Sequence, residues 1–155
     1  MANSILFFGT DPFYSLPVLQ RLFQSRAYKL DVVIGKNIDT RKPLIDFARN
    51  NLLNIHEFDH LDPLVRYDFG VVASFGQLIP ENIIKSFNKN ILNVHPSYIP
   101  LYRGPNPIIR AMMDGSDTTG VTILEVSPNK SIFADAGMIV AEFFISAIYK
   151  YFVHS

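Results

Sequence analysis

Short runs of β-branched and aromatic residues recur along the chain, and each is followed by a stretch with the spacing of a helix. The runs at 4–9, 29–35, 67–76 and 91–95 are bounded by glycine, proline or polar residues, which is typical of buried strands. The third run is rich in valine and alanine, as in parallel strands covered on both faces. This alternation predicts an α/β domain built of βαβ units.

Helices are predicted between these strands from the apolar spacing and from proline positions. The predicted segments are 11–23, 41–51, 80–85 and 107–115. Pro43 is expected in the first turn of its helix, where its missing N–H has no helical partner. A further strand is predicted at 120–126. The run that begins at Gly137 starts like a strand and then becomes densely aromatic.

Composition limits the class of protein. The 155 residues suit one domain, and the formal net charge of zero removes the simplest mark of a nucleic-acid binder. The chain has no cysteine, which excludes disulfides, thiolate metal sites and cysteine nucleophiles. No apolar stretch is long enough to span a bilayer.

The segment ILNVHPSYIP at 91–100 places two polar side chains at the end of a predicted strand. Residues two apart on a strand share a face, so Asn93 and His95 project together. Their position at the carboxyl end is where open α/β sheets bind ligands. Pro96 and Pro100 stiffen the loop that follows. The alternative is an ordinary strand end whose polar residues are solvated.

Two other segments carry candidate functional groups. Asp135 precedes a glycine by two residues, which is typical of a turn; a contact with His95 would instead favour the charged imidazolium. The segment GTDPF at 9–13 joins a strand to a helix, a natural cradle for an anion. Arg103 lies beside Gly104, and simple solvation of its guanidinium is the alternative.

Several blocks together resemble the folate-dependent formyltransferases, in particular the branch that formylates methionyl-tRNA. The blocks are ILFFGTDPF, VVASFGQLIP, ILNVHPSYIPLYRGPNPI, TGVTILEV and DAGMIVA, in the same order over almost the whole chain. The resemblance implies a Rossmann-like formyltransferase fold, with a mostly parallel sheet and helices on both faces, curtailed at the C-terminus. It implies a catalytic domain at 1–145 and an atypical tail at 146–155, without the family's C-terminal tRNA-binding domain.

The resemblance implies an enzyme that transfers a formyl group from 10-formyltetrahydrofolate to the amino group of methionine on initiator tRNA. It assigns catalysis to Asn93, His95 and Asp135. An amine attacks the formyl carbon, and negative charge builds on the formyl oxygen. Asn93 and His95 would stabilise that charge. Asp135 would orient the imidazole and help to take the proton of the amine.

The family's binding segments also match positions of this chain. The formyl donor is expected to bind, without a metal, at Ser97, Tyr98, Ile99, Pro100, Phe75, Gln77, Leu78 and Ile79. The acceptor is expected to contact Gly9, Thr10, Phe13, Arg103 and Gly104.

The resemblance further implies a monomer without membrane association that serves translation initiation. The expected compartment is the mitochondrial matrix, with the bacterial cytoplasm as the alternative. Two other functions remain open. One is a formyltransferase that acts on a small amine, such as an amino sugar or glycinamide ribonucleotide. The other is an inactive folate-binding fragment, which the unusual aromatic end of the chain favours.

Overall fold

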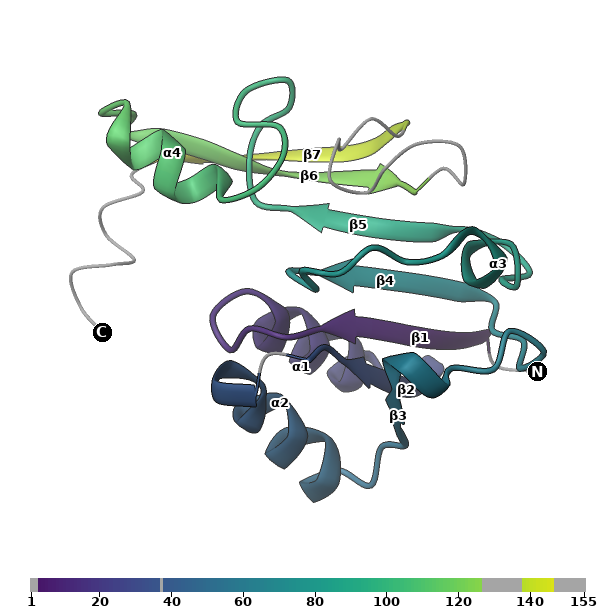
Figure 1. The fold of residues 1–155 in the computed structure, drawn as a ribbon. Helices are drawn as coiled ribbons and strands as arrows, with labels where there is room; N and C mark the ends of the chain where they lie inside the picture. The colour runs from purple at the N-terminus through teal and green to yellow at the C-terminus, as the bar shows by residue number, and fades with distance from the viewer. Residues whose placement is uncertain (1–2, 37, 127–137, 147–155) are drawn as a thin grey trace.

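The computed structural model describes residues 3–36, 38–126 and 138–146. Within these residues seven strands form one sheet in the order β3-β2-β1-β4-β5-β6-β7 (Figure 1). The strands are β1 (Asn3–Gly9), β2 (Tyr28–Ile34), β3 (Ile55–Glu57), β4 (Phe69–Ala73), β5 (Ile91–His95), β6 (Thr118–Glu125) and β7 (Ile139–Ser146). The helices are α1 (Ser15–Ser25), α2 (Ile38–Asn50), α3 (Glu81–Ile84), α4 (Pro107–Met113) and a 3-10 turn, η1 (Phe58–His60).

The sheet is parallel from β3 to β5, which confirms the predicted mostly parallel α/β fold. β1 is the middle one of these five parallel strands and pairs in parallel with both β2 and β4. The chain first builds outward from β1 to β2 and β3, and then crosses to β4 and β5 on the other side. The carboxyl ends of β1 and β4 therefore diverge at a topological switch point, where such sheets form ligand crevices.

The last two strands run antiparallel to their neighbours, which corrects the expectation of a βαβ unit at 120–126. β6 pairs antiparallel with β5, and β7 pairs antiparallel with β6. A parallel strand would require the chain to cross back to the opposite end of the sheet. The connection, residues 96–117, instead stays near the end where β5 stops, because α4 lies there and does not cross the sheet (Figure 1).

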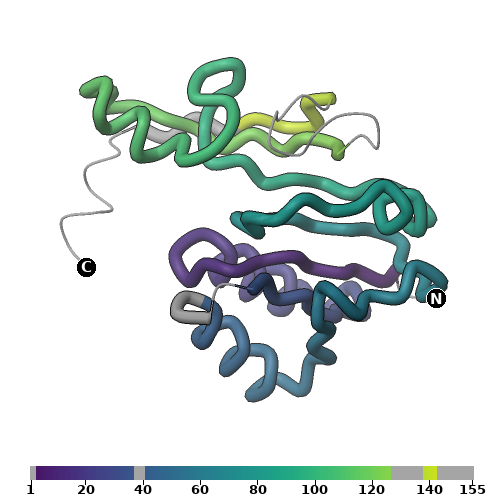
Figure 2. The backbone as a smooth tube through the Cα atoms, viewed as in Figure 1, coloured from purple at the N-terminus to yellow at the C-terminus, as the bar shows by residue number. Residues whose placement is uncertain are grey.

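Apolar side chains cover both faces of the sheet. On one face, α1 and α2 bury Leu19, Leu44 and Ala48 against the central strands. On the other, the chain turns back after β4 and runs toward α3 at the far end of the sheet (Figure 2). This return segment and α3 bury Phe75, Ile79 and Ile83. None of the described helices is long and apolar enough to cross a membrane.

The start of α2 differs from the prediction. The helix begins at Ile38, so Pro43 lies inside it and not in its first turn. A proline within a helix costs a backbone hydrogen bond. Leu44 and Ala48, both with no exposed surface, anchor the helix to the sheet and offset that cost.

A buried polar cluster joins β2, β3 and the approach to β4. The Asp31 carboxylate accepts hydrogen bonds from Tyr67 Oη at 2.7 Å and Asn54 Nδ2 at 3.0 Å, and His56 Nε2 lies 3.4 Å away. Burial, the hydrogen bond to Asp31 and the negative charge of Asp31 raise the pKa of Tyr67 well above its ordinary range. The phenol therefore stays neutral in the folded protein.

The Thr122 hydroxyl connects β6 to the loop that follows β5. Thr122 is fully buried and lies opposite His95 in the sheet. Its Oγ1 donates to the Ser97 carbonyl at 2.7 Å and accepts the Ile99 N–H at 3.1 Å. The antiparallel strand thus holds the loop after β5 through two buried hydrogen bonds.

Replacing Tyr67 by Phe is expected to lower the free energy of unfolding by about 1–2 kcal/mol at neutral pH, because Asp31 loses a buried donor. Because the pKa of Tyr67 is higher in the folded than in the unfolded protein, its contribution to the free energy of unfolding is complete below the unfolded-state pKa. That contribution is lost as the pH rises above the unfolded-state pKa. The gap between wild type and Tyr67→Phe should therefore stay constant to about pH 10 and narrow above it. Urea unfolding over a pH series measures this gap.

The exposed Tyr28 supplies the control, since Tyr28→Phe is expected to leave the free energy of unfolding unchanged. A gap for Tyr67→Phe that does not narrow above that pH would contradict the buried phenol assignment.

Replacing Thr122 by Val is expected to lower the free energy of unfolding by about 1–3 kcal/mol, because a buried carbonyl and a buried N–H lose their partner. Thr119 is the matched control. Its Oγ1 is buried and has no hydrogen-bond partner among the described residues. Thr119→Val should therefore be neutral or stabilising. Equal losses for the two variants, measured by urea unfolding, would contradict the bracing role of Thr122.

Candidate functional site

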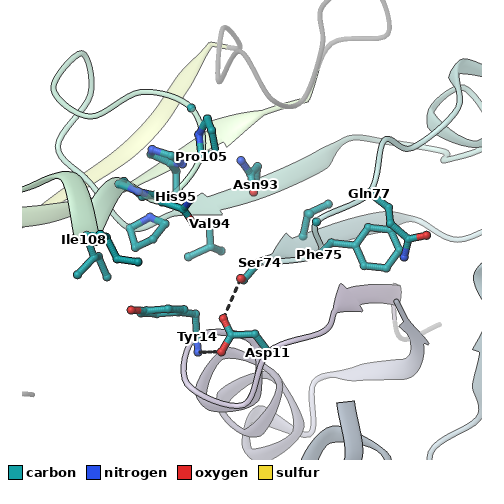
Figure 3. A pocket seen from close by; sticks show the side chains of 17 residues that line it. Asp11, Tyr14, Ser74, Phe75, Gln77, Asn93, Val94, His95, Pro105 and Ile108 are labelled. Carbon is teal, nitrogen blue, oxygen red and sulfur yellow. Dashed lines mark hydrogen bonds between the residues drawn. The ribbon is translucent and has the colours of Figure 1, made fainter. Parts of the chain in front are cut away.

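A cavity of about 290 Å³ opens at the carboxyl ends of β1, β4 and β5 (Figure 3). It lies at the switch point of the sheet. Its wall is formed by Asp11, Tyr14, Val72, Ser74, Phe75, Gly76, Gln77, Asn93, Val94, His95, Pro96, Gly104, Pro105, Asn106, Pro107, Ile108 and Ile109. Loops that follow three neighbouring strands thus meet the start of α4 around one hollow.

Asn93 and His95 share one wall of this cavity. The burial of β5 alternates, and both residues lie on its more buried side, with 9% and 5% of their surfaces exposed. Figure 3 shows both side chains at the end of β5, across the cavity from Asp11 and Tyr14. An amide and an imidazole are therefore presented together in a partly desolvated pocket, where hydrogen bonds to a developing charge are strong.

The His95 ring is anchored to the loop that follows β5. Its Nε2 donates to the carbonyl of Tyr102 at 3.2 Å, which makes Nε2 a protonated nitrogen, because a carbonyl can only accept. The same loop is held by Ser97 Oγ, which donates to the Leu101 carbonyl at 2.9 Å. The orientation of the imidazole is thus coupled to the path of residues 96–102.

Asp135, the third expected catalytic residue, lies outside the described residues.

The expected donor-binding residues fall into three groups. Phe75 and Gln77 line the cavity, and Gln77 Nε2 is buried without a hydrogen-bond partner among the described residues. Ile79 lies in the core beneath this segment, while Leu78 is exposed. Ser97, Tyr98, Ile99 and Pro100 form the adjoining loop and do not line this cavity. Ser97 and Ile99 are buried there, and Tyr98 and Pro100 are exposed.

Most of the expected acceptor-binding residues lie outside the wall of the cavity. Gly104 lines the cavity, whereas Gly9, Thr10, Phe13 and Arg103 do not. Thr10 instead donates from Oγ1 to the Phe75 carbonyl at 2.8 Å. Phe13 is 75% exposed. At Gly9 an added Cβ would lie 2.7 Å from the Ser15 Cβ, so this glycine permits the close packing of α1 against β1.

The expected site residues did not include Asp11, Tyr14 and Ser74, which also line the cavity, although Asp11 lay within the predicted anion cradle at 9–13. Asp11 and Tyr14 come from the loop after β1, and Ser74 follows β4. Ser74 Oγ donates to Asp11 Oδ2 at 2.9 Å across the switch point. Burial and the negative charge of Asp11 raise the pKa of Tyr14. The position of Asp11 and Ser74 just beyond the ends of strands was the available signal, but no sequence pattern indicated that the two loops pair.

The start of α4 also contributes to the wall, through residues 105–109. The sequence predicted a helix from residue 107 but no site role for residues 105–109, because nothing in their spacing indicates which side meets β5. The site as a whole offers hydrogen-bond donors on one wall and a carboxylate on the other. Among the described residues, no group of three or more His, Cys, Asp or Glu could hold a metal ion.

Comparison with known proteins identifies relatives of this chain. A family profile described as formyl transferase matches residues 26–151. The mitochondrial methionyl-tRNA formyltransferase of Rattus norvegicus is 40% identical over 134 residues, which cover 81% of this chain and 34% of that protein. The methionyl-tRNA formyltransferase of Finegoldia magna is 35% identical over 142 residues, covering 81% of this chain and 45% of that protein.

A solved structure shares the fold. The phosphoribosylglycinamide formyltransferase of Brucella melitensis superposes with a TM-score of 0.73 at 20% identity, over 95% of this chain and 81% of that one. This chain spans between a third and a half of the length of the two methionyl-tRNA formyltransferases it matches. From the matching family profile, the chain belongs to the formyl transferase family.

Proposed function

We propose that this chain transfers a formyl group from 10-formyltetrahydrofolate to the amino group of methionine carried by initiator tRNA. The observation that carries the proposal is the joint burial of Asn93 and His95 in the cavity at the switch point. The names of the relatives from Rattus norvegicus and Finegoldia magna support methionyl-tRNA as the acceptor. Identity to the mitochondrial relative also supports a mitochondrial location.

The residues around the cavity fit a flat, polar heterocycle such as the ring system of a folate. Gln77 provides a buried hydrogen-bond donor that no described residue uses, and Phe75, which also lines the cavity, packs its ring into the core and is 3% exposed. A buried donor without a partner is costly until a ligand accepts from it. We therefore assign the formyl donor, 10-formyltetrahydrofolate, to the side of the cavity formed by the segment after β4, next to the loop at 97–100.

The reaction requires stabilisation of one developing negative charge. When an amine attacks the formyl carbon, electrons shift to the formyl oxygen, and that oxygen needs hydrogen-bond donors. The Asn93 amide supplies one donor, and the doubly protonated imidazolium of His95 supplies another from Nδ1, because its Nε2–H is held by the Tyr102 carbonyl. Each is worth on the order of 3 kcal/mol when aimed at the oxyanion. Asp135 would orient the imidazole and help to accept the proton that the amine loses. The bond from the formyl carbon to N10 then breaks, and the proton passes to N10 of the departing tetrahydrofolate.

Labelled 10-formyltetrahydrofolate tests the proposal directly. We expect label to appear on methionine when the chain is offered charged initiator tRNA, measured after acid precipitation of the tRNA. Uncharged tRNA is the control, because it has no α-amino group to receive the label. The proposal fails if label passes only to an amino sugar or to glycinamide ribonucleotide, which are the small-amine alternatives. Folate binding without transfer to any acceptor would instead indicate an inactive binding fragment.

Two variants test the assigned chemistry. Asn93→Asp replaces an NH₂ donor by an acceptor of the same shape and should lower kcat by roughly 100-fold. His95→Ala should abolish measurable transfer while circular dichroism shows an intact fold. His60→Ala is the matched control, because that imidazole is 80% exposed and does not line the cavity. Turnover near that of wild type in His95→Ala would exclude the proposed oxyanion role.

A further inference from the structure

The loop between β1 and α1 uses all of its own backbone N–H groups. The N–H groups of Thr10 and Asp11 both donate to Ser15 Oγ, at 3.1 and 3.2 Å. Those of Phe13 and Tyr14 donate to Asp11 Oδ1, at 2.7 and 3.3 Å. Ser15 N donates to the Asp11 carbonyl, and proline at position 12 has no N–H. The sequence predicted an anion cradle here, but the chain's own oxygens occupy its donors.

The carboxylate that fills this loop also gives the cavity wall its charge. Asp11 Oδ2 accepts only the Ser74 hydroxyl among the hydrogen bonds described for it, and the residue lines the cavity. Figure 3 shows Asp11 and Tyr14 on the side opposite Asn93 and His95. No Lys or Arg occurs among the residues that form the wall, all of which the structure describes. Arg103 lies outside this wall, and its carbonyl accepts from Arg110.

Building on the proposed function, we propose that Asp11 determines the charge class of the acceptor. The cavity accepts a protonated primary amine whose carrier places no phosphate against the loop at 10–15. It excludes an amine whose carrier would place a phosphate there. By its name, the Brucella melitensis structure is a formyltransferase of phosphoribosylglycinamide, an amine that does carry a phosphate. The charge of Asp11 therefore distinguishes the two acceptor classes that the fold alone leaves open.

The physical basis is a competition between two anions. A phosphate at this loop would have to displace the Asp11 carboxylate from two N–H groups, and would then lie beside a like charge. A protonated amine meets the opposite situation, because the same carboxylate attracts it in a cavity partly shielded from water. The bound ammonium must then give one proton to a base, which the proposed function assigns to Asp135, before its nitrogen attacks the formyl carbon. The charge acts on binding of the acceptor and not on the formyl oxygen, which lies with Asn93 and His95.

A titration with inorganic phosphate tests whether the Asp11 carboxylate blocks anion binding at this loop, and it does not require enzyme activity. In ¹H–¹⁵N spectra of the full chain, the amide signals of Phe13 and Tyr14 should not move when phosphate is added to wild type. Asp11→Ala removes the carboxylate and frees both N–H groups, so the two signals should shift and saturate. Movement of these signals in wild type, or none in folded Asp11→Ala, would overturn the proposal.

A second variant separates charge from loop shape. Asp11→Asn keeps a carbonyl oxygen that can accept both N–H groups but removes the negative charge. We expect its KM for charged initiator tRNA to rise by on the order of tenfold, with kcat unchanged, as for one lost attraction near a protein surface. An unchanged KM with transfer intact would overturn the charge-selection role.

Asp62 offers a matched control at an exposed site. Its Oδ1 accepts the Leu64 N–H at 2.8 Å in a similar turn, and the residue does not line the cavity. Asp62→Asn should therefore leave both KM and the phosphate titration unchanged. If wild type transfers formyl to no amine at all, the proposed function fails, while the phosphate titration still decides whether Asp11 closes the loop.

Discussion

The Ser15 hydroxyl holds two strand ends together at the topological switch point of the sheet. It is fully buried, accepts the N–H groups of Thr10 and Asp11, and donates to the carbonyl of Ala73. One side chain at the start of α1 thus ties the end of β1 to the end of β4. Since the cavity opens between these two strand ends, its shape depends on this contact. The absence of a Cβ at Gly9 allows the approach, because a larger residue would collide with Ser15.

The second constraint on the cavity comes from the antiparallel half of the sheet. β6 lies beside β5 and holds the loop after it through the two hydrogen bonds of Thr122. The Tyr102 carbonyl at the far end of that loop receives the His95 imidazole. The path from β6 through the loop to the ring is short and well packed. Positioning of the proposed catalytic histidine therefore depends on a strand that contributes no residue to the cavity wall.

The two walls of the cavity have opposite chemical character, and this division suits a reaction between an amine and a formyl group. Hydrogen-bond donors on β5 face the place where negative charge would develop. A carboxylate after β1 faces the place from which a positively charged acceptor would approach. Because the two strands lie on either side of β4, the distance between the walls is set by the sheet and not by flexible loops. Such separation lets one cavity favour binding of a cation and formation of an anion.

The sequence by itself determined the elements and the polar pair. Strand periodicity located β1, β2, β4 and β5, and alternation put Asn93 and His95 on one face, because that spacing is a local property of an extended chain. The resemblance to a family added the expected roles.

Tertiary structure decided which elements became neighbours. The connection through α4 stays at one end of the sheet, so that β6 returns antiparallel to β5, and the crossing from β3 to β4 brought Ser74 to Asp11. Local sequence could not specify these contacts, because they join residues that are far apart in the chain and depend on sheet order.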